Sequence, residues 1–350
     1  MGEADPTRVE ALLTELTLDE KAALGAGASL WRTHGVARLG IPALRVTDGP
    51  NGARGSHFAG GATAACFPCG SALAASFSPG LVEAVGRALG EEARTKRAHV
   101  LLGPTVNMHR SPLGGRHFEG YSEDPRLAAE TAAAFVRGVQ SAGVAACVKH
   151  FVANDSEFER MSISSELEPR TLREITLPPF EAALREAGAW SLMAAYNGLG
   201  GTTCSANATL LGELLRDEWG WDGVVMSDWF GTKDTVGSAR GGLDLEMPGP
   251  PRFYGAKLAE AVRRGEVDEA VLDEKARRLL RLLARTGALD EAGEPEPEEA
   301  VDRDDHRALA RRAATEALVL LRNEGDVLPF EREGLRRLEA AMLQCKNIVT

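Results

Sequence analysis

The feature that most constrains the fold of this chain is an alternation of short apolar runs with longer amphipathic stretches. The short runs are rich in valine, alanine and leucine, as expected for strands buried on both faces, and the longer stretches have helical apolar spacing. The expected strands are residues 43–46, 99–102, 145–150, 191–196 and 223–226, and the expected helices are residues 81–97, 126–142, 168–187 and 208–218. This order predicts a parallel α/β architecture, most simply a (β/α)8 TIM-like barrel.

The remaining sequence suggests a second, incomplete domain. Residues 1–286 have about the length of one such barrel, roughly 250 residues. Residues 287–302 are acidic, contain proline and have little to bury, so they are expected to form a linker. Residues 303–350 include a candidate helix at 304–318 and a candidate strand beginning at 317–321, too little for an independent core. We therefore expect the chain to be truncated at the beginning of its second domain.

Composition restricts the class of ligand. The chain has 51 acidic and 40 basic residues and a net charge of -11, which disfavours nucleic acids and anionic membranes and suits a neutral or cationic ligand. No apolar run approaches the roughly 20 residues that cross a bilayer, and the N-terminus lacks the pattern of a secretory signal. A cytoplasmic protein is expected.

The cysteines do not indicate a cofactor or a metal. They number five and are scattered, which favours reduced thiols over a disulfide framework. Cys66 and Cys69 have the spacing of a CxxC pair, but no second pair follows to complete a zinc site. We expect no cofactor and no bound metal.

Asp228 is the leading candidate for chemistry. It follows the expected strand 223–226 and is itself followed by Trp229. In a parallel barrel, active sites lie at the carboxyl ends of the strands, and a carboxylate beside an indole suits the chemistry of sugars. The alternative is an aspartate that only caps the next helix.

Two other polar residues are expected in loops at the same end. Asp48 stands where the first strand breaks into a Gly/Pro turn, and it could grip a pair of sugar hydroxyls or simply initiate the turn. Arg116 follows two glycines in a polar loop. It could bind sugar hydroxyls or only form a solvated salt bridge.

The next two strands add further candidates. Lys149 and His150 end an apolar run, and Arg160 adds a third cationic group in the loop that follows. Lys149 could bind hydroxyls beside a carboxylate, form a Schiff base or make a structural ion pair. Tyr196 ends the following strand, and Met193 within that strand has core packing as its alternative role.

Together these segments resemble the N-terminal part of a family 3 glycoside hydrolase of the β-glucosidase type. The matching segments are VTDGP (46–50), GRHFE (115–119) with SEDP (122–125), KHF (149–151), RTLRE (170–174), MAAYN (193–197) and VMSDW (225–229). Their order over about 200 residues makes coincidence an unsatisfactory explanation. The resemblance runs from about residue 16 to residue 330. Within it, residues 317–329 are similar to the beginning of the family's second domain.

The resemblance implies a (β/α) barrel followed by an α/β sandwich domain, and a retaining mechanism. Asp228 would be the nucleophile that forms a covalent glycosyl intermediate on a terminal β-D-glucosyl residue, and nearby cations would keep it ionised. The partner is then a small β-glucoside or oligosaccharide. The implied binding residues of the first sugar subsite are Asp48, Arg116, Lys149, His150, Arg160 and Tyr196, with Met193 and Trp229 lining the same pocket.

A retaining mechanism also needs a second carboxyl group about 5 to 5.5 Å from the nucleophile. In relatives it is a glutamate after the barrel, and residues 339–350 match nothing expected there. Unless Glu119, Glu157 or Glu246 substitutes, activity is expected to be impaired. Two alternatives remain, which are an inactive or merely sugar-binding remnant and a Schiff-base lyase or aldolase that uses Lys149.

Overall fold

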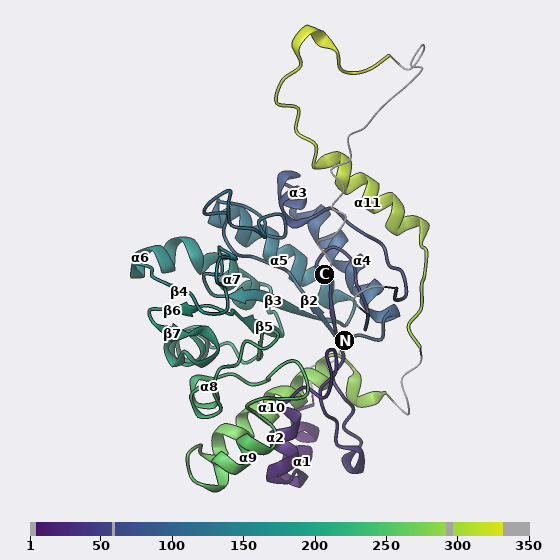
Figure 1. Cartoon of the computed structure of the whole chain (residues 1–350). Coiled ribbons are helices and arrows are strands. Elements are labelled where there is room, and N and C mark those ends of the chain that lie inside the picture. The colour runs from purple at the N-terminus through teal and green to yellow at the C-terminus, as the bar shows by residue number, and fades with distance from the viewer. Residues whose placement is uncertain (1–4, 58–59, 292–296, 332–350) are drawn as a thin grey trace.

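The computed structural model of the protein describes residues 5–57, 60–291 and 297–331, and at its centre five parallel strands are enclosed by helices (Figure 1). The strands lie in the order β1 (Val46–Asp48), β2 (Val100–Leu102), β3 (Ala145–Phe151), β5 (Ser191–Ala194) and β8 (Val224–Ser227). The five predicted strands occur in the predicted order. The first lies a few residues later than predicted, because residues 44 and 45 pair with the antiparallel segment 32–33 instead.

Three short segments complete the ring of strands. Leu245 bridges Met226 of β8 in parallel, and Glu246 bridges Ala26. Gly27 pairs with Thr33 in antiparallel fashion, and Arg32 pairs with Arg45, next to β1. The fold is therefore a TIM-like barrel, as predicted, with one reversed segment and a seam held by single bridges.

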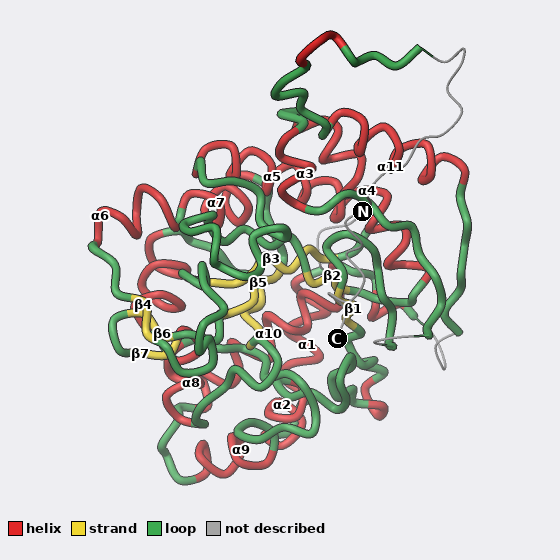
Figure 2. The backbone as a smooth tube through the Cα atoms, turned by 45° about the horizontal axis from the view of Figure 1, so that its top comes forward, coloured by secondary structure: helices red, strands yellow, loops and turns green. Residues whose placement is uncertain are grey.

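Helices cover the outside of this ring (Figure 2). The two longest on one side, α4 (Pro79–Thr95) and α5 (Pro125–Ser141), begin with proline after a Ser or Asp side chain that caps the first turn. The helix predicted at 168–187 is present as contiguous α- and π-helical segments, α6 (Pro169–Thr171), η2 (Leu172–Thr176), α7 (Pro178–Glu181) and η3 (Ala182–Glu186), whose junction residues are also helical. The π-helical segment η5 (Thr209–Glu218) precedes β8. The other helices are α1 (Pro6–Glu15), α2 (Leu18–Leu24), η1 (Ala37–Leu39), α3 (Gly70–Ala75), η4 (Cys204–Ala206), α8 (Val236–Gly241), α9 (Ala256–Arg263), α10 (Glu269–Arg285) and η6 (Ala288–Asp290).

The alternation of side chains along the strands divides the apolar core into two clusters. Leu101, Val148 and Val225 point outward and pack against the helices, as Leu89 of α4 and Phe135 of α5 do from the other side. The intervening residues, such as Cys147, Met193 and Met226, fill the barrel interior together with residues of α1 and α10. Because Asp48 and Lys149 continue the inward series of their strands, the fold delivers them to the mouth of the barrel.

A separate small sheet, formed by β4 (Ser164–Ser165), β6 (Gly198–Leu199) and β7 (Thr202–Thr203), lies beside this mouth. No helix in the described part of the chain is long and apolar enough to cross a membrane.

The described part of the predicted linker is anchored to the barrel by its acidic residues. The Ser56 amide donates to the Glu298 carboxylate at 2.8 Å, and Arg97 pairs with Glu299 at 2.8 Å. Helix α11 (Asp304–Glu316) then packs on α3 and α4, where His306 lies between Glu91 and Glu92 at 3.1 and 2.7 Å.

The segment after α11 does not form the predicted strand. Residues 318–323 have no regular structure, η7 (Glu324–Asp326) follows, and Leu321 is 91% exposed (Figure 1). The prediction of a strand at 317–321 is wrong for this structure, because no strand in the described part of the chain lies beside these residues to share backbone hydrogen bonds with them. The predicted tail at 339–350 lies outside the described residues.

Candidate functional site

Asp228 lies immediately after β8 at the mouth of the barrel and is only 8% exposed. The backbone amide of Trp229 donates to its Oδ1 at 2.7 Å, and the Tyr196 hydroxyl interacts with the same buried carboxylate. The backbone then turns sharply, with the Gly231 amide donating to the Asp228 carbonyl at 2.8 Å. The carboxylate is thus fixed on one oxygen and does not cap a helix, so the alternative role considered for it does not apply.

Buried Lys149 and partly exposed Asp48 form an ion pair across the mouth. The Lys149 ammonium donates to Asp48 Oδ1 at 2.9 Å, and Arg54 lies 3.7 Å from Oδ2. Burial alone would raise the pKa of Asp48, but Lys149 and, more weakly, Arg54 lower it below its ordinary value. The pair presents a carboxylate and an ammonium together, which is the combination that grips adjacent hydroxyl groups.

His150 is held in one orientation by Asn107. The Asn107 amide nitrogen donates to the His150 carbonyl at 2.9 Å, and its oxygen lies 2.9 Å from the His150 backbone nitrogen and 3.1 Å from Nδ1. Nδ1 therefore carries a proton, and Nε2 is left to accept from Arg116 at 3.3 Å. Burial and the charges of Arg116, Lys149 and Arg160 hold the pKa of His150 well below its usual range. His150 is thus neutral, and its 3.6 Å approach to Asp228 is not an ion pair.

Two glutamates hold the arginines of the site. Glu119 receives two hydrogen bonds from Arg116, at 2.9 and 2.8 Å, and Glu157 pairs with Arg160 at 2.6 Å. The Arg160 guanidinium also stacks 4.8 Å above the ring of Tyr196. Burial and the nearby Asp228 charge raise the pKa of Tyr196, which keeps its hydroxyl a neutral donor.

The charge balance at Asp228 differs from the one expected. Burial raises the pKa of Asp228 above its ordinary value, and Lys149, the Trp229 amide, the Tyr196 hydroxyl and Arg116 only partly oppose this. The expectation that cations simply favour the ionised form was therefore incomplete, because desolvation outweighs them. Ionised Asp228 is a desolvated anion.

Trp229 and Met193 take different places. The Trp229 indole donates to the Leu30 carbonyl at 3.0 Å and packs on Trp31, with ring centres 5.4 Å apart, at the edge of the site. Met193 is buried in the barrel interior, opposite Met226 in the strand register. Direct contact between Met193 and a sugar stays a prediction.

None of the three barrel glutamates considered as a second carboxyl is free. Arg116 and Lys149 lower the pKa of Glu119 against the effect of its burial, and Glu157 is paired with Arg160. Glu246 accepts backbone amides of residues 252–254 at 2.6 to 3.2 Å and so anchors a loop.

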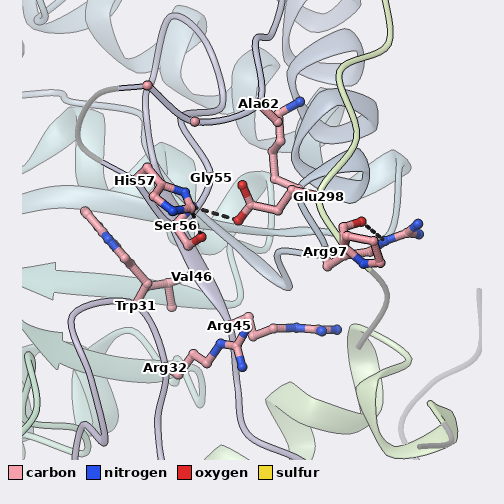
Figure 3. A pocket seen from close by; sticks show the side chains of 14 residues that line it. Trp31, Arg32, Arg45, Val46, Gly55, Ser56, His57, Ala62, Arg97 and Glu298 are labelled. Atoms are coloured by element: carbon pink, nitrogen blue, oxygen red, sulfur yellow. Dashed lines mark hydrogen bonds between the residues drawn. The ribbon is translucent and has the colours of Figure 1, made fainter. Parts of the chain in front are cut away.

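A larger cavity lies away from these residues. It measures about 410 Å³ and is bounded by Trp31, Arg32, Arg45, Glu298 and the segments 55–57 and 60–62 (Figure 3). None of the nine predicted site residues lines it, and Trp31 stands between it and Trp229. It is a crevice where the anchored linker crosses the barrel.

The residues that position the site were not among those predicted from the sequence. Asn107, which fixes His150, follows β2 just as the predicted residues follow their own strands, and this placement was the available signal. The roles of Glu119 and Glu157 as partners of arginines also had a local signal, because each glutamate lies three residues from its arginine in the same loop.

The fold and the site define a class. A barrel whose mouth combines a buried carboxylate, a carboxylate–ammonium pair, arginines and an indole is of the kind that carbohydrate-processing enzymes use. The model of the Glycosyl hydrolase family 3 N terminal domain matches residues 18–282, and the chain belongs to this family.

Individual relatives agree with this assignment. The chain is 51% identical over 331 residues to a β-glucosidase of Rhizobium radiobacter, covering 94% of this chain and 40% of that protein. It is 47% identical over 340 residues to β-glucosidase B of Emericella nidulans, covering 97% and 40%. The structure of the Kluyveromyces marxianus β-glucosidase in complex with glucose superposes with a TM-score of 0.88 at 43% identity, covering 93% and 40%. The chain therefore spans about 40% of the length of these relatives.

Proposed function

We propose that the chain carries the nucleophile and first sugar subsite of a retaining β-glucosidase. In this proposal, an Asp228 oxygen attacks the anomeric carbon of a terminal β-glucosyl group, the bond to the aglycone oxygen breaks, and a glycosyl ester forms on Asp228. The observation that carries the proposal is the Asp228 carboxylate, buried at the barrel mouth and fixed through one oxygen.

The surrounding groups suit a glucosyl unit. Asp48 and Lys149 offer an acceptor and a donor 2.9 Å apart, and Arg116 and neutral His150 face the same mouth. Arg160 and Tyr196 add a stacked pair, and the Tyr196 hydroxyl interacts with Asp228. The glucose complex of the Kluyveromyces marxianus relative supports glucose as the bound sugar.

The geometry favours this role of Lys149 over a Schiff-base role. An attacking amine needs a free lone pair, and Lys149 donates to the Asp48 carboxylate instead. The barrel also offers no free carboxyl among Glu119, Glu157 and Glu246 to protonate a leaving group. We therefore infer that substrates with poor leaving groups, such as cellobiose, turn over very slowly on this chain.

A covalent trapping experiment tests the proposal. A dinitrophenyl glucoside fluorinated beside the anomeric carbon has a leaving group that departs without protonation, so it should add one fluoroglucosyl unit to the intact chain. Peptide mapping should place the label on Asp228. The Asp228→Asn variant should stay unlabelled, and Asp222→Asn, which changes an exposed aspartate paired with Arg281, should label normally. A label on any other residue would refute the assignment.

A further inference from the structure

Phe230 lies two residues beyond Asp228, on the turn that follows β8. Its amide donates to the Met247 carbonyl at 3.0 Å, and the turn is closed by the hydrogen bond from Gly231 to Asp228. Its side chain is 41% exposed. Because the turn extends from the carboxyl end of β8, Phe230 lies on the face of the barrel that carries the site.

The backbone gives no reason for a bulky residue at this position. Phe230 has a φ of 66°, in the left-handed region, where a side chain is sterically disfavoured and glycine is not. Strain of this kind persists where the surrounding structure enforces it, and it concentrates at functional sites. The reason for phenylalanine is to be sought in its ring.

The ring is supported from one side. The Arg252 guanidinium lies 4.4 Å from its centre, in cation–π geometry. Arg252 is itself fixed, because its amide donates at 3.0 Å to Glu246, which also binds the next two amides of the loop. The two residues come from adjacent segments of the ring, since Leu245 bridges Met226. A partly exposed aromatic ring, supported on one side, thus lies two residues beyond the proposed nucleophile.

We infer that Phe230, backed by Arg252, is a specificity-determining residue that stacks on a flat aryl aglycone of the substrate. The inference rests on the proposed function, because it adds the leaving-group side to the proposed glucosyl subsite. Aromatic rings that stack or meet edge to face gain affinity beyond simple burial, whereas a small alkyl aglycone offers too little surface for this. Arg252 adds a positive charge that favours electron-rich or phenolic rings.

Binding of two inert glucosides tests the inference without any bond cleavage. We would measure by calorimetry the Kd of phenyl thioglucoside and of methyl thioglucoside for the full chain. The wild type should prefer the phenyl compound, and Phe230→Gly should reduce this preference by roughly threefold to tenfold, the range of one aromatic pair. Phe230→Tyr, which keeps a flat ring, should restore it.

Phe77 provides a matched control, because it is also an exposed phenylalanine at positive φ, 73% exposed at the end of α3 and outside the site. Phe77→Gly should leave the phenyl preference intact. The melting temperature of Phe230→Gly should be no lower than that of the wild type, because glycine relieves the backbone strain at the positive φ of residue 230.

The outcomes separate this inference from the proposed function. An unchanged preference in Phe230→Gly, or a wild type that does not discriminate between the two compounds, would overturn the role of Phe230. If the trapping reagent does not label Asp228 but the phenyl preference persists, the assignment of Asp228 as the nucleophile is refuted and the role of Phe230 in binding the aryl group is retained.

Discussion

Replacing Lys149 with methionine should affect both the stability of the barrel mouth and the ionisation of Asp228. Lys149 is 4% exposed, and its ammonium lies 2.9 Å from Asp48. Removing one partner of a fully buried pair costs about 3–5 kcal/mol. The Asp48 carboxylate is partly exposed and retains Arg54 at 3.7 Å, so we expect a smaller loss of unfolding free energy, about 2–3 kcal/mol.

The pH dependence has a definite sign. The pKa of Asp48 is lowered in the folded chain, so its stabilising effect is present above its unfolded pKa of about 3.9 and is lost as pH falls through the folded pKa. The stability difference between wild type and Lys149→Met should therefore shrink in acid. The pKa of Asp228, already raised, should rise further without Lys149, and the acid limb of labelling should move to higher pH.

Urea unfolding at several pH values, together with the pH profile of trapping, measures both effects. Lys275→Met is the matched control, because Lys275 is equally buried but donates to the Leu243 carbonyl, away from the site. It should lower stability and leave the acid limb in place. An acid limb that does not move in Lys149→Met, or that moves equally in both variants, would refute the electrostatic reasoning.

Three further predictions concern other groups. At neutral pH the free energy of unfolding of Asp228→Asn should exceed that of the wild type by about 1–2 kcal/mol, measured by urea unfolding, because the substitution removes a desolvated anion. This gain should fade in acid as wild-type Asp228 protonates. Asn107→Ala should lower the free energy of unfolding by about 2–3 kcal/mol and slow the labelling of Asp228, because His150 loses its fixed orientation. Labelling at the wild-type rate would contradict this role of Asn107. His306→Ala should expose α11 to limited proteolysis before the barrel unfolds, whereas Arg307→Ala, on the exposed side, should change stability by under about 0.5 kcal/mol.

The sequence carried most of the information about the strands and the residues at their ends. Runs such as 145–151 are apolar on both faces, and a polar residue at the end of such a run is unusual enough to be noticed. Asp48, Lys149 and Asp228 were found in this way. Their convergence follows from the parallel arrangement alone, because the carboxyl ends of all the strands meet at one mouth.

Contacts between distant loops could not be predicted in the same way. The net desolvation of Asp228 depends on how completely the loops cover it, and periodicity does not report coverage. The anchoring of the acidic linker depends on Ser56 and Arg97, which are far from it in sequence. A strand pattern at 317–321 shows only a propensity, and a strand forms only where a partner is available.

The seam of the barrel has a consequence for folding. Its bridge between Ala26 and Glu246 joins residues from opposite ends of the barrel sequence. The bridge can therefore stabilise the fold only after the intervening elements have formed. We expect amides 26–33 to exchange hydrogen earlier than those of β3 and β5, by opening events that leave the rest of the ring intact. Trp31 lies on this seam and packs on Trp229, which follows Asp228. The segment that we expect to open most readily therefore supports one edge of the candidate site.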